Sequence, residues 1–379
     1  MTPAPISDAD RYSRQILFAG IGPAGQQRLA AAHVAVIGCG AMGAASASLL
    51  ARAGIGTLTL IDRDFVEPSN LQRQILYDEA DAQESLPKAE AARRHIARFN
   101  SNVQVHAHIA DLVPANIAGL LGPAHILLDA TDNFETRYLL NDFAVQQGKP
   151  WIYAAAIGAY AATMNILPGK LSSRSEAEGS ASLPGNPAPY APTACLACIF
   201  PKPPTGNLQT CDTSGILATA VNLAASIQVT EALKFLTGQP HLMRRTLISF
   251  ELWNPALWDP AGSAALERSE ISAGTPRPDC EVCGQRNFTH LAGQDRAHIT
   301  LCGRDSVQIH EHHRPVDFAA MRARLSAHTD IQALRSNDLL LRFRRGPHTF
   351  TLFADGRAIV QGTTDITVAR SLYARFIGA

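Results

Sequence analysis

The sequence predicts an α/β fold, a doubly wound and mostly parallel Rossmann-like sheet, followed by a small α+β domain. Between Val34 and about Ile166, apolar strand-like runs alternate with segments of helical spacing, a pattern typical of right-handed βαβ units. Residues 33–62, HVAVIGCGAMGAASASLLARAGIGTLTLID, join a strand, a glycine-rich turn, an alanine-rich helix and a second strand. After about Asn287, short alternating strands with a hairpin signal predict an antiparallel sheet.

The length and the charge of the chain indicate its domain organisation and its broad class of protein. The 379 residues are enough for more than one core, and we expect one domain over residues 1–286 and a second over residues 287–379. Lys plus Arg and Asp plus Glu are both 33, so no overall basic field favours nucleic acid or an anionic membrane as a partner. The first residues lack the pattern of a signal peptide, and no uninterrupted apolar run reaches membrane-spanning length. We therefore expect a soluble cytoplasmic protein.

The glycine-rich turn predicts a nucleotide site. Gly38 permits a tight turn, Gly40 lets a phosphate approach the backbone, and Gly43 lets the following helix pack closely on its strand. The helix directs its N-terminal amides and the positive end of its dipole at the phosphates. Asp62 ends the second strand, where a carboxylate accepts hydrogen bonds from ribose hydroxyls. The alternative is a glycine turn in a βαβ unit that binds no nucleotide.

The elements follow in order. Residues 11–32 predict a short helix, a glycine-bearing loop and a second helix, and polar clusters then follow the predicted strand ends after Ile61 and after ILLDA. Residues 169–192 change to Ser, Pro, Gly and Ala with no clear period, so we assign them no regular structure. Further elements are expected as helices at 87–100, 135–147, 214–237, 316–327 and 367–378, and as strands at 103–109, 126–131, 151–157, 246–253, 299–310, 339–345 and 348–362.

Four cysteines form two CxxC pairs, Cys195 with Cys198 and Cys280 with Cys283. Each pair places two thiolates on a tight turn, and together they give the closed S4 donor set that structural zinc prefers. The pairs are some eighty residues apart in the sequence, so the metal joins the middle of the domain to its end. The alternatives are reduced buried cysteines or a redox dithiol, although a redox site needs only one pair.

At this point the sequence resembles the ThiF/MoeB/HesA family. The motifs RYSRQ, GCGAMG, LTLID, SNLQRQ, Pro87-Lys88, ATDN, TRYLLND, a TC followed by a glycine, and the two CxxC pairs occur in the family's order. Members are ubiquitin-activating-type adenylyltransferases that serve sulfur carrier proteins in thiamin or molybdopterin biosynthesis. The motifs cover about Arg11 to Gln285. The chain departs from the family at Leu196 and Ala197, where an arginine is frequent inside the first CxxC.

The resemblance implies an activity. The enzyme uses ATP to adenylylate the C-terminal glycine of a ubiquitin-like carrier that ends in Gly-Gly, which gives an acyl-adenylate and pyrophosphate, and a sulfur donor protein is a further partner. It also implies residue roles: Asp62 holds the ribose, Asn70, Arg73 and Lys88 bind the phosphates, and Asp132 binds Mg²⁺. In a homodimer, Arg14 reaches the triphosphate from the partner subunit.

Several of these residues have simpler alternative roles. Arg73 is then a surface ion-pair partner, Lys88 a solvated charge at a helix start, and Asp132 the N-cap of the helix beginning near Asn133. Cys211 matches the family cysteine that joins covalently to the activated carrier or relays sulfur, and its alternative is an incidental thiol. Cys39 is interpreted as structural.

Two other functions use the same motifs. A Rossmann oxidoreductase that binds NAD also needs the glycines and Asp62, but SNLQRQ and ATDN have no role in it. A non-enzymatic scaffold would bind a ubiquitin-like partner through its C-terminal domain, yet Arg14, Arg73, Lys88 and Asp132 are all present, which argues against an inactive site.

Overall fold

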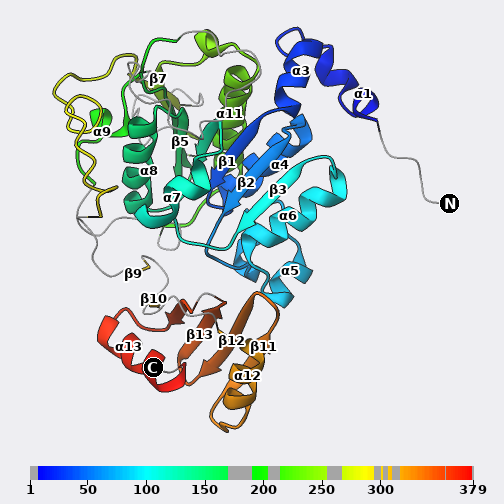
Figure 1. Cartoon of the computed structure of the whole chain (residues 1–379), viewed down its shortest axis with the longest axis vertical. Coiled ribbons are helices and arrows are strands. Elements are labelled where there is room, and N and C mark those ends of the chain that lie inside the picture. The colour runs from blue at the N-terminus through cyan, green and yellow to red at the C-terminus, as the bar shows by residue number, and fades with distance from the viewer. Residues whose placement is uncertain are drawn as a thin grey trace. The chain divides into compact units, whose positions relative to one another are not determined.

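The computed structural model describes residues 7–169, 190–203, 214–253, 267–293, 300–301, 306–309, 316–354 and 356–377. The chain divides into two compact units (Figure 1). The first comprises Met1–Leu208 and Ile216–Gln294, and the second comprises Gln209–Gly215 and Asp295–Ala379. Among the described helices, none combines the length and apolar character needed to cross a bilayer.

The first unit is built on an eight-stranded sheet with the strand order β3-β2-β1-β4-β5-β6-β7-β8. The first five strands in this order run parallel to one another, and each of the last three pairs antiparallel with the strand before it. The predicted doubly wound α/β sheet is therefore confirmed. The strands are β1 His33–Ile37, β2 Thr57–Ile61, β3 Gln104–His108, β4 Ile126–Asp129, β5 Trp151–Ile157, β6 Tyr160–Ile166, β7 Thr246–Glu251 and β8 Glu267–Ser272.

Helices cover both faces of this sheet, because its central strands are apolar on both sides. Val34 and Val36 of β1 belong to one buried cluster, with side chains from α3, α4, α6 and α11, whereas Ala35 and Ile37 belong to another, with α7 and α8. The helices are α1 Asp8–Arg11, α2 Ser13–Ile16, α3 Gly22–Ala30, α4 Ala41–Ala53, α5 Glu79–Glu84, α6 Lys88–Phe99, α7 Pro114–Leu121, α8 Phe134–Gln147, α9 Leu196–Ile199 and α11 Ala218–Leu236, with short 3-10 turns η1 Pro68–Asn70 and η2 Pro240–Leu242.

Helix α11 packs on α4, β5 and β6, and it begins at Ala218 rather than near residue 214 as the sequence predicted. Its polar residue Gln228 is fully buried. The side-chain amide of Gln228 donates to the carbonyl oxygens of Asp129 (2.7 Å) and Ile152 (2.9 Å) and accepts from the Ser46 hydroxyl (2.9 Å). A glutamine within an apolar stripe therefore joins α11 to α4 and to two strands.

The second unit holds a six-stranded antiparallel sheet in the order β11-β12-β13-β14-β10-β9. Side chains of α12 and α13 pack on one face of it, where the rings of Phe343 and Phe350 stack with centroids 4.5 Å apart. The predicted α+β character is confirmed. The elements are β9 Thr300–Leu301, β10 Ser306–Ile309, α12 Phe318–Ser326, β11 Gln332–Ser336, β12 Leu340–Arg345, β13 His348–Phe353, β14 Ala358–Gln361 and α13 Ile366–Phe376.

Differences from the sequence-based expectation include two strand regions. The single strand predicted over residues 299–310 is wrong, because β9 and β10 pair with each other in antiparallel register. Strand β8 was not predicted. Its sequence, ERSEIS, is polar, and it lies at the edge of the sheet with a mostly exposed surface, so no apolar alternation marks it.

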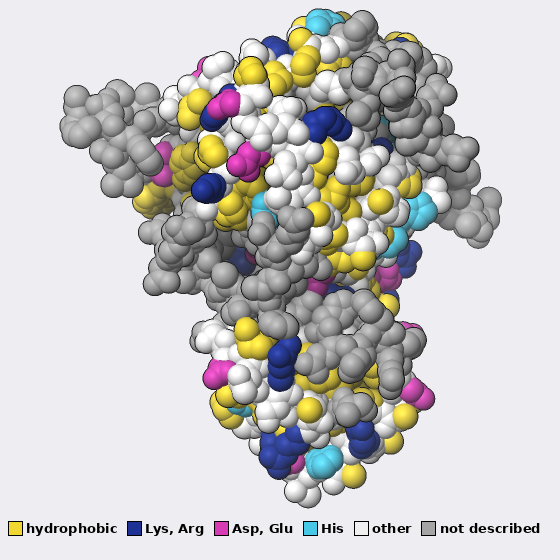
Figure 2. Space-filling model, turned by 60° about the vertical axis from the view of Figure 1, so that its left-hand side comes forward, with side chains coloured by type: hydrophobic (Ala, Val, Ile, Leu, Met, Phe, Trp, Pro, Cys, Tyr) yellow, Lys and Arg dark blue, Asp and Glu magenta, His cyan; other side chains and the backbone are white. Residues whose placement is uncertain are grey.

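Charged side chains of both signs lie scattered among apolar and neutral ones on the face shown in Figure 2. This distribution agrees with the equal numbers of basic and acidic residues in the sequence.

Candidate active site

The glycine-rich turn connects β1 to α4, and its three glycines differ in whether the chain leaves room for a side chain. Gly38 has a φ of 93°, and a Cβ there would lie 2.5 Å from the carbonyl oxygen of Ala130. A Cβ at Gly43 would overlap the carbonyl oxygen of Gly38. In contrast, a Cβ at Gly40 would meet no atom of the described residues within 4 Å. The fold itself therefore requires Gly38 and Gly43, whereas packing within the described part of the chain does not require glycine at Gly40.

Asp62 lies directly after β2 and is tied to the glycine turn. Its carboxylate accepts the backbone amide of Cys39 at 2.5 Å and that of Asp64 at 2.7 Å. Burial raises the pKa of Asp62, while the nearby Lys88 ammonium acts in the opposite direction. The carboxylate is thus held at the end of β2, beside the glycine turn.

Lys88 begins α6 and is almost completely buried, with 3% of its side chain exposed. Its ammonium lies 3.1 Å from a carboxylate oxygen of Asp64. The alternative of a solvated charge at the helix start is therefore wrong. A buried lysine at a strand end beside a glycine turn suits the binding of an anionic phosphate.

Asn70 and Arg73 belong to the segment that follows β2. Asn70 is buried, and its side-chain oxygen accepts the backbone amide of Glu67 at 3.1 Å, which fixes the turn η1. Arg73 is half-buried, and its guanidinium donates to the carbonyl oxygen of Ser69 at 2.7 Å. Within the described part of the chain, Arg73 forms no ion pair, so the surface ion-pair alternative has no support there.

Asp132 is exposed in the loop after β4. The N-cap of α8 is Asn133, whose side-chain oxygen accepts the backbone amide of Thr136 at 2.8 Å. The alternative of Asp132 as the N-cap is therefore wrong. Asp111 mainly raises the pKa of Arg63 and Asp129 mainly raises that of Arg137, and the carboxylate of Asp132 is near enough to add a smaller contribution to both.

Sequence reasoning missed the pair that supports this loop. Asp129 and Arg137 are both buried, and Arg137 Nε donates to Asp129 Oδ2 at 3.1 Å. Arg137 also donates to the carbonyl oxygens of Thr131 (2.6 Å) and Ala154 (3.2 Å). Burial raises the pKa of Asp129, and Arg137 opposes that shift. The available signal was an aspartate ending an apolar strand with an arginine in the first turns of the following helix.

Tyr77 joins the glycine turn to the start of α6. Its buried hydroxyl lies 2.7 Å from the carbonyl oxygen of Cys39 and 3.1 Å from that of Lys88. Gly38 and Gly43 also contact the loop at Ala130. The structure therefore brings together the glycine turn, Asp62, Lys88 and the loop that carries Asp132 at the carboxyl ends of the parallel strands, where ligands of such folds bind.

Arg14 is exposed on α2, and no contact among the described residues joins it to the glycine turn. Cys211 lies outside the described residues. Cys39 is fully buried, burial raises the pKa of its thiol, and its backbone amide bonds Asp62, in agreement with a structural role.

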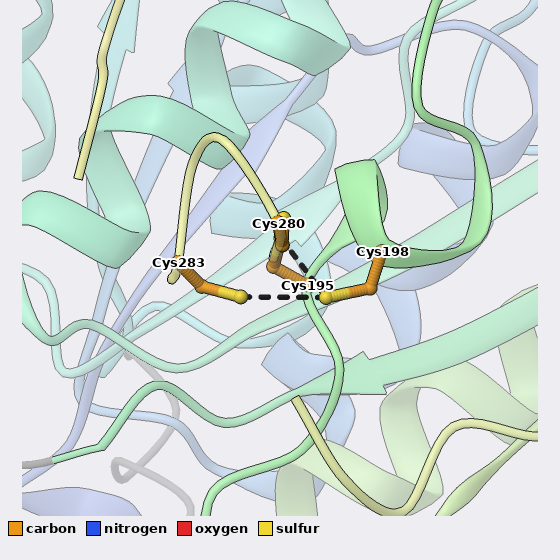
Figure 3. Close-up of side chains that lie close together, drawn as sticks. All are labelled: Cys195, Cys198, Cys280 and Cys283. Atoms are coloured by element: carbon orange, nitrogen blue, oxygen red, sulfur yellow. Dashed lines mark hydrogen bonds between the residues drawn. The ribbon is translucent and has the colours of Figure 1, made fainter. Parts of the chain in front are cut away.

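The four cysteines of the CxxC pairs converge (Figure 3). The Sγ–Sγ distances are 3.8 Å for Cys195–Cys198, 3.6 Å for Cys195–Cys280 and 3.3 Å for Cys198–Cys283. A tetrahedral site with Zn–S bonds of about 2.3 Å has sulfur–sulfur edges of about 3.8 Å, so this donor set fits zinc with slight expansion.

The surroundings of the cluster orient its sulfurs. The backbone amide of Arg277 donates to Cys198 Sγ at 3.3 Å, and the Leu196 amide donates to the buried side chain of Asn141 at 2.9 Å. Hydrogen bonds from the neighbouring thiols of Cys195 and Cys283, and more weakly from the Arg277 amide, lower the pKa of Cys198. The bond from the Arg277 amide is the kind of support that metal-binding thiolates receive from outside the ligand set.

Comparison with known proteins identifies the family, because the model of the ThiF family matches residues 12–273. The chain belongs to the ThiF family. A sulfur carrier protein ThiS adenylyltransferase from Bacillus subtilis (strain 168) is 40% identical over 372 residues, which cover 97% of this chain and 99% of that protein. A sulfur carrier protein adenylyltransferase from Thermus thermophilus is 33% identical over 280 residues, 73% of this chain and 91% of that protein.

Solved structures share the ThiF-family fold. E. coli MccB in complex with MccA-N7isoASN gives a TM-score of 0.57 at 24% identity, covering 74% of this chain and 75% of that chain. The similarity to the B. subtilis protein also extends past Gln285, where the motif resemblance stopped, and into the second unit. The second unit therefore is not peculiar to this chain.

Proposed function

We propose that this chain uses ATP to adenylylate the C-terminal glycine of a ubiquitin-like sulfur carrier protein of the ThiS or MoaD type. The products are a carrier acyl-adenylate and pyrophosphate, and the activated carrier then accepts sulfur in thiamin or molybdopterin biosynthesis. Two observations support this assignment: the chain belongs to the ThiF family, and it is 40% identical to the B. subtilis ThiS adenylyltransferase over almost the full length of that protein. The cytoplasm supplies ATP and reducing conditions that keep thiols free, so we propose that location.

The site can perform this reaction without a strong general base. A C-terminal carboxylate is already ionised at neutral pH, so its attack on the α-phosphate needs mainly alignment and neutralisation of charge. In our proposal, Lys88 and Arg73 stabilise the negative charge of the triphosphate, and Asn70 orients it. Asp62 accepts hydrogen bonds from the ribose. Gly38, Gly40 and Gly43 allow the phosphates to approach the backbone and the N-terminus of α4.

Asp132 is the proposed ligand of Mg²⁺, which when bound neutralises phosphate oxygens. An exposed carboxylate in a loop beside the glycine turn fits this role, since oxygen donors and retained water suit this ion. Zn²⁺ is the proposed metal of the four-cysteine cluster, where it has a structural role.

A homodimer would complete the site. The carrier is one protein partner, a sulfur donor is a second, and a second copy of this chain is the third. Leu17 and Phe18 follow Arg14 and are 74% and 65% exposed, an unusual exposure for large apolar side chains on a free surface. Burial of this segment against a second copy would present Arg14 to the partner subunit's triphosphate.

Cys211 is the proposed thiol that reacts with the activated carrier after adenylation. It has no CxxC partner, so the metal site leaves it available. We further propose that residues 287–379 form a domain that serves docking rather than the nucleotide chemistry, because the motif residues all lie before residue 287.

ATP–pyrophosphate exchange tests the function directly. Zinc-loaded protein is assayed with and without a panel of small carriers that end in Gly-Gly, and each carrier is matched with a version that lacks the terminal glycine. We expect one intact carrier to stimulate exchange and its truncated form to have no effect. Absence of exchange with every carrier, in folded protein, would overturn the proposed function. Nicotinamide-dependent hydride transfer would instead support the oxidoreductase alternative.

A further inference from the structure

A short backbone pairing fixes Lys88 against the end of β2. The Lys88 amide donates to the carbonyl oxygen of Asp64 at 2.8 Å, the Val66 amide donates to that of Leu86 at 2.8 Å, and Phe65 forms an antiparallel bridge with Pro87. The first residue of α6 is therefore held beside the residues that follow β2. This pairing places the side chains of Asp64 and Lys88 on the same edge of the sheet, next to the glycine turn.

The two side chains form an ion pair with unequal burial. The Lys88 ammonium and the Asp64 carboxylate are 3.1 Å apart, with 3% and 16% of the respective side chains exposed. Asp64 is itself held in place, because its amide donates to Asp62 Oδ1 at 2.7 Å. A lysine this buried needs a compensating negative charge to remain protonated.

We propose that Asp64 is a positioning residue of the nucleotide site, which keeps the Lys88 ammonium charged and directed to the triphosphate. This inference rests on the proposed function, because it takes Lys88 as a phosphate ligand. Asp64 itself acts through Lys88 and carries no role in the sequence-based set of site residues.

The other charged groups near Asp64 and Lys88 agree with a positioning role for Asp64 and a phosphate-binding role for Lys88. Asp62 and the Cys39 thiol interact electrostatically with Lys88, but the Asp62 carboxylate already accepts two backbone amides and is the proposed ribose ligand. Arg63 faces Asp64 and Asp132 and is ion-paired to Asp111 at 2.9 Å. Of these groups, Asp64 is the carboxylate in direct contact with the ammonium.

The substitution Asp64→Asn tests the charge of this side chain without changing its size. Asparagine keeps the size of the side chain and leaves the backbone pairing intact, but it leaves Lys88 as a buried cation without that carboxylate. Burial then favours the neutral amine, so Lys88 loses its proton as pH rises. We expect ATP affinity to fall by about 10- to 100-fold relative to wild type at pH 8.5, and by about threefold or less at pH 6.5.

Isothermal titration calorimetry with ATP measures this effect without a carrier. Zinc-loaded wild type, Asp64→Asn and Asp64→Glu are titrated at pH 6.5, 7.5 and 8.5, with Mg²⁺ and with a chelator. The glutamate variant retains the charge and should restore the wild-type pH profile. Thermal unfolding without ATP confirms that each variant is folded. If the Asn variant does not fold, a folded Asp64→Glu variant whose ATP affinity falls as pH rises, although its charge is kept, would overturn the proposal.

Asp111→Asn is the matched control. It breaks the neighbouring Arg63–Asp111 pair, but an arginine stays protonated over the whole range, so ATP affinity should show no new pH dependence. A uniform loss of affinity for Asp64→Asn at all three pH values, or a loss that occurs only with Mg²⁺, would overturn the positioning role. Wild type that binds ATP but lacks exchange would overturn the adenylation reaction alone.

Discussion

Arg137 Nε donates to Asp129 Oδ2 at 3.1 Å, and both side chains are buried beneath the loop that carries Asp132. The pair joins the end of β4 to the first turns of α8, and Arg137 adds bonds to the carbonyl oxygens of Thr131 and Ala154. The loop is therefore supported by a salt bridge that is almost completely buried. The Asp129–Arg137 pair and the loop residue Asp132 can be tested by separate substitutions.

Asp129→Asn should destabilise the folded protein. Removing one partner leaves Arg137 as a buried charge without compensation, and such changes cost about 3–5 kcal/mol. Urea unfolding measures the free energy of unfolding. The exposed pair of Arg277 and Asp279 is the control, and Asp279→Asn should leave the free energy of unfolding nearly unchanged because solvent screens this pair. Equal effects of the two substitutions would contradict the assignment of the Asp129–Arg137 pair as a support.

Asp132→Ala should abolish adenylation without loss of stability, since the side chain is exposed and is proposed to hold Mg²⁺. Loss of one charge-stabilising group costs roughly 10²- to 10³-fold in rate. Pyrophosphate exchange and the urea midpoint are measured together. Glu135→Ala, which removes a second exposed acid in the first turn of α8, should retain near-normal exchange. Near-normal exchange in Asp132→Ala would remove this residue from the mechanism.

Gly40→Ala and Gly43→Ala should behave differently although both lie in one motif. A Cβ at Gly43 would overlap the Gly38 carbonyl oxygen, so Gly43→Ala should lower the free energy of unfolding by about 1–3 kcal/mol. A Cβ at Gly40 meets no atom of the described residues within 4 Å, so Gly40→Ala should remain as stable as wild type and lose ATP affinity. Urea unfolding and calorimetry separate the two. A stable Gly40→Ala variant with unchanged ATP affinity would exclude close approach of the phosphates at that residue.

Stability should decrease on acidification through His33. Burial, with His125, His106 and Lys149 nearby, lowers the pKa of His33 to about 4. The unfolded chain, with a histidine pKa near 6.5, binds the extra proton first, so the contribution is complete above about pH 6.5 and is lost as pH falls toward 4. His33→Gln should reduce the loss of unfolding free energy between pH 7 and pH 5, by on the order of 1–2 kcal/mol. Identical pH dependence in both proteins would show that His33 does not contribute.

Metal analysis should find about one zinc per chain. Cys280→Ser should lose the metal and lower the melting temperature, because the cluster joins residues 195–198 to residues 280–283. Cys39→Ser, which alters a cysteine outside the cluster, should retain the metal. Folded protein without any bound metal would refute the site.

Much of the fold could be predicted because its signals are local. The β1 apolar run, the glycines after it and the CxxC turns each carry their meaning within a few residues, and the structure has a strand, a sharp turn and a thiol cluster there. Asn133 shows the limit of this approach. The sequence allowed Asp132 as the N-cap of α8, whereas the N-cap in the structure is Asn133, one residue later. Only the hydrogen bond from the Thr136 amide to the Asn133 side chain decides between the two.

The remaining features depend on partners that are distant in the sequence. The contact of Asp64 with Lys88 joins residues 24 positions apart, and the bond between Cys39 and Asp62 joins residues 23 apart. Neither pairing has a spacing rule, because the sheet order determines which strand ends meet. Strand β8 was missed for a related reason: an edge strand gains its stability from the neighbour β7 rather than from its own apolar pattern.

The bonds of Gln228 bear on how the chain folds during its synthesis. Its amide satisfies carbonyl groups of Asp129 and Ile152, which are 99 and 76 residues earlier in the chain. A nascent chain that ends before α11 would expose those carbonyls and the apolar surfaces of β5 and β6. Helix α11 must therefore emerge from the ribosome before the nucleotide-binding half of the first unit can finish folding. We expect chaperones to bind the nascent chains that end before α11.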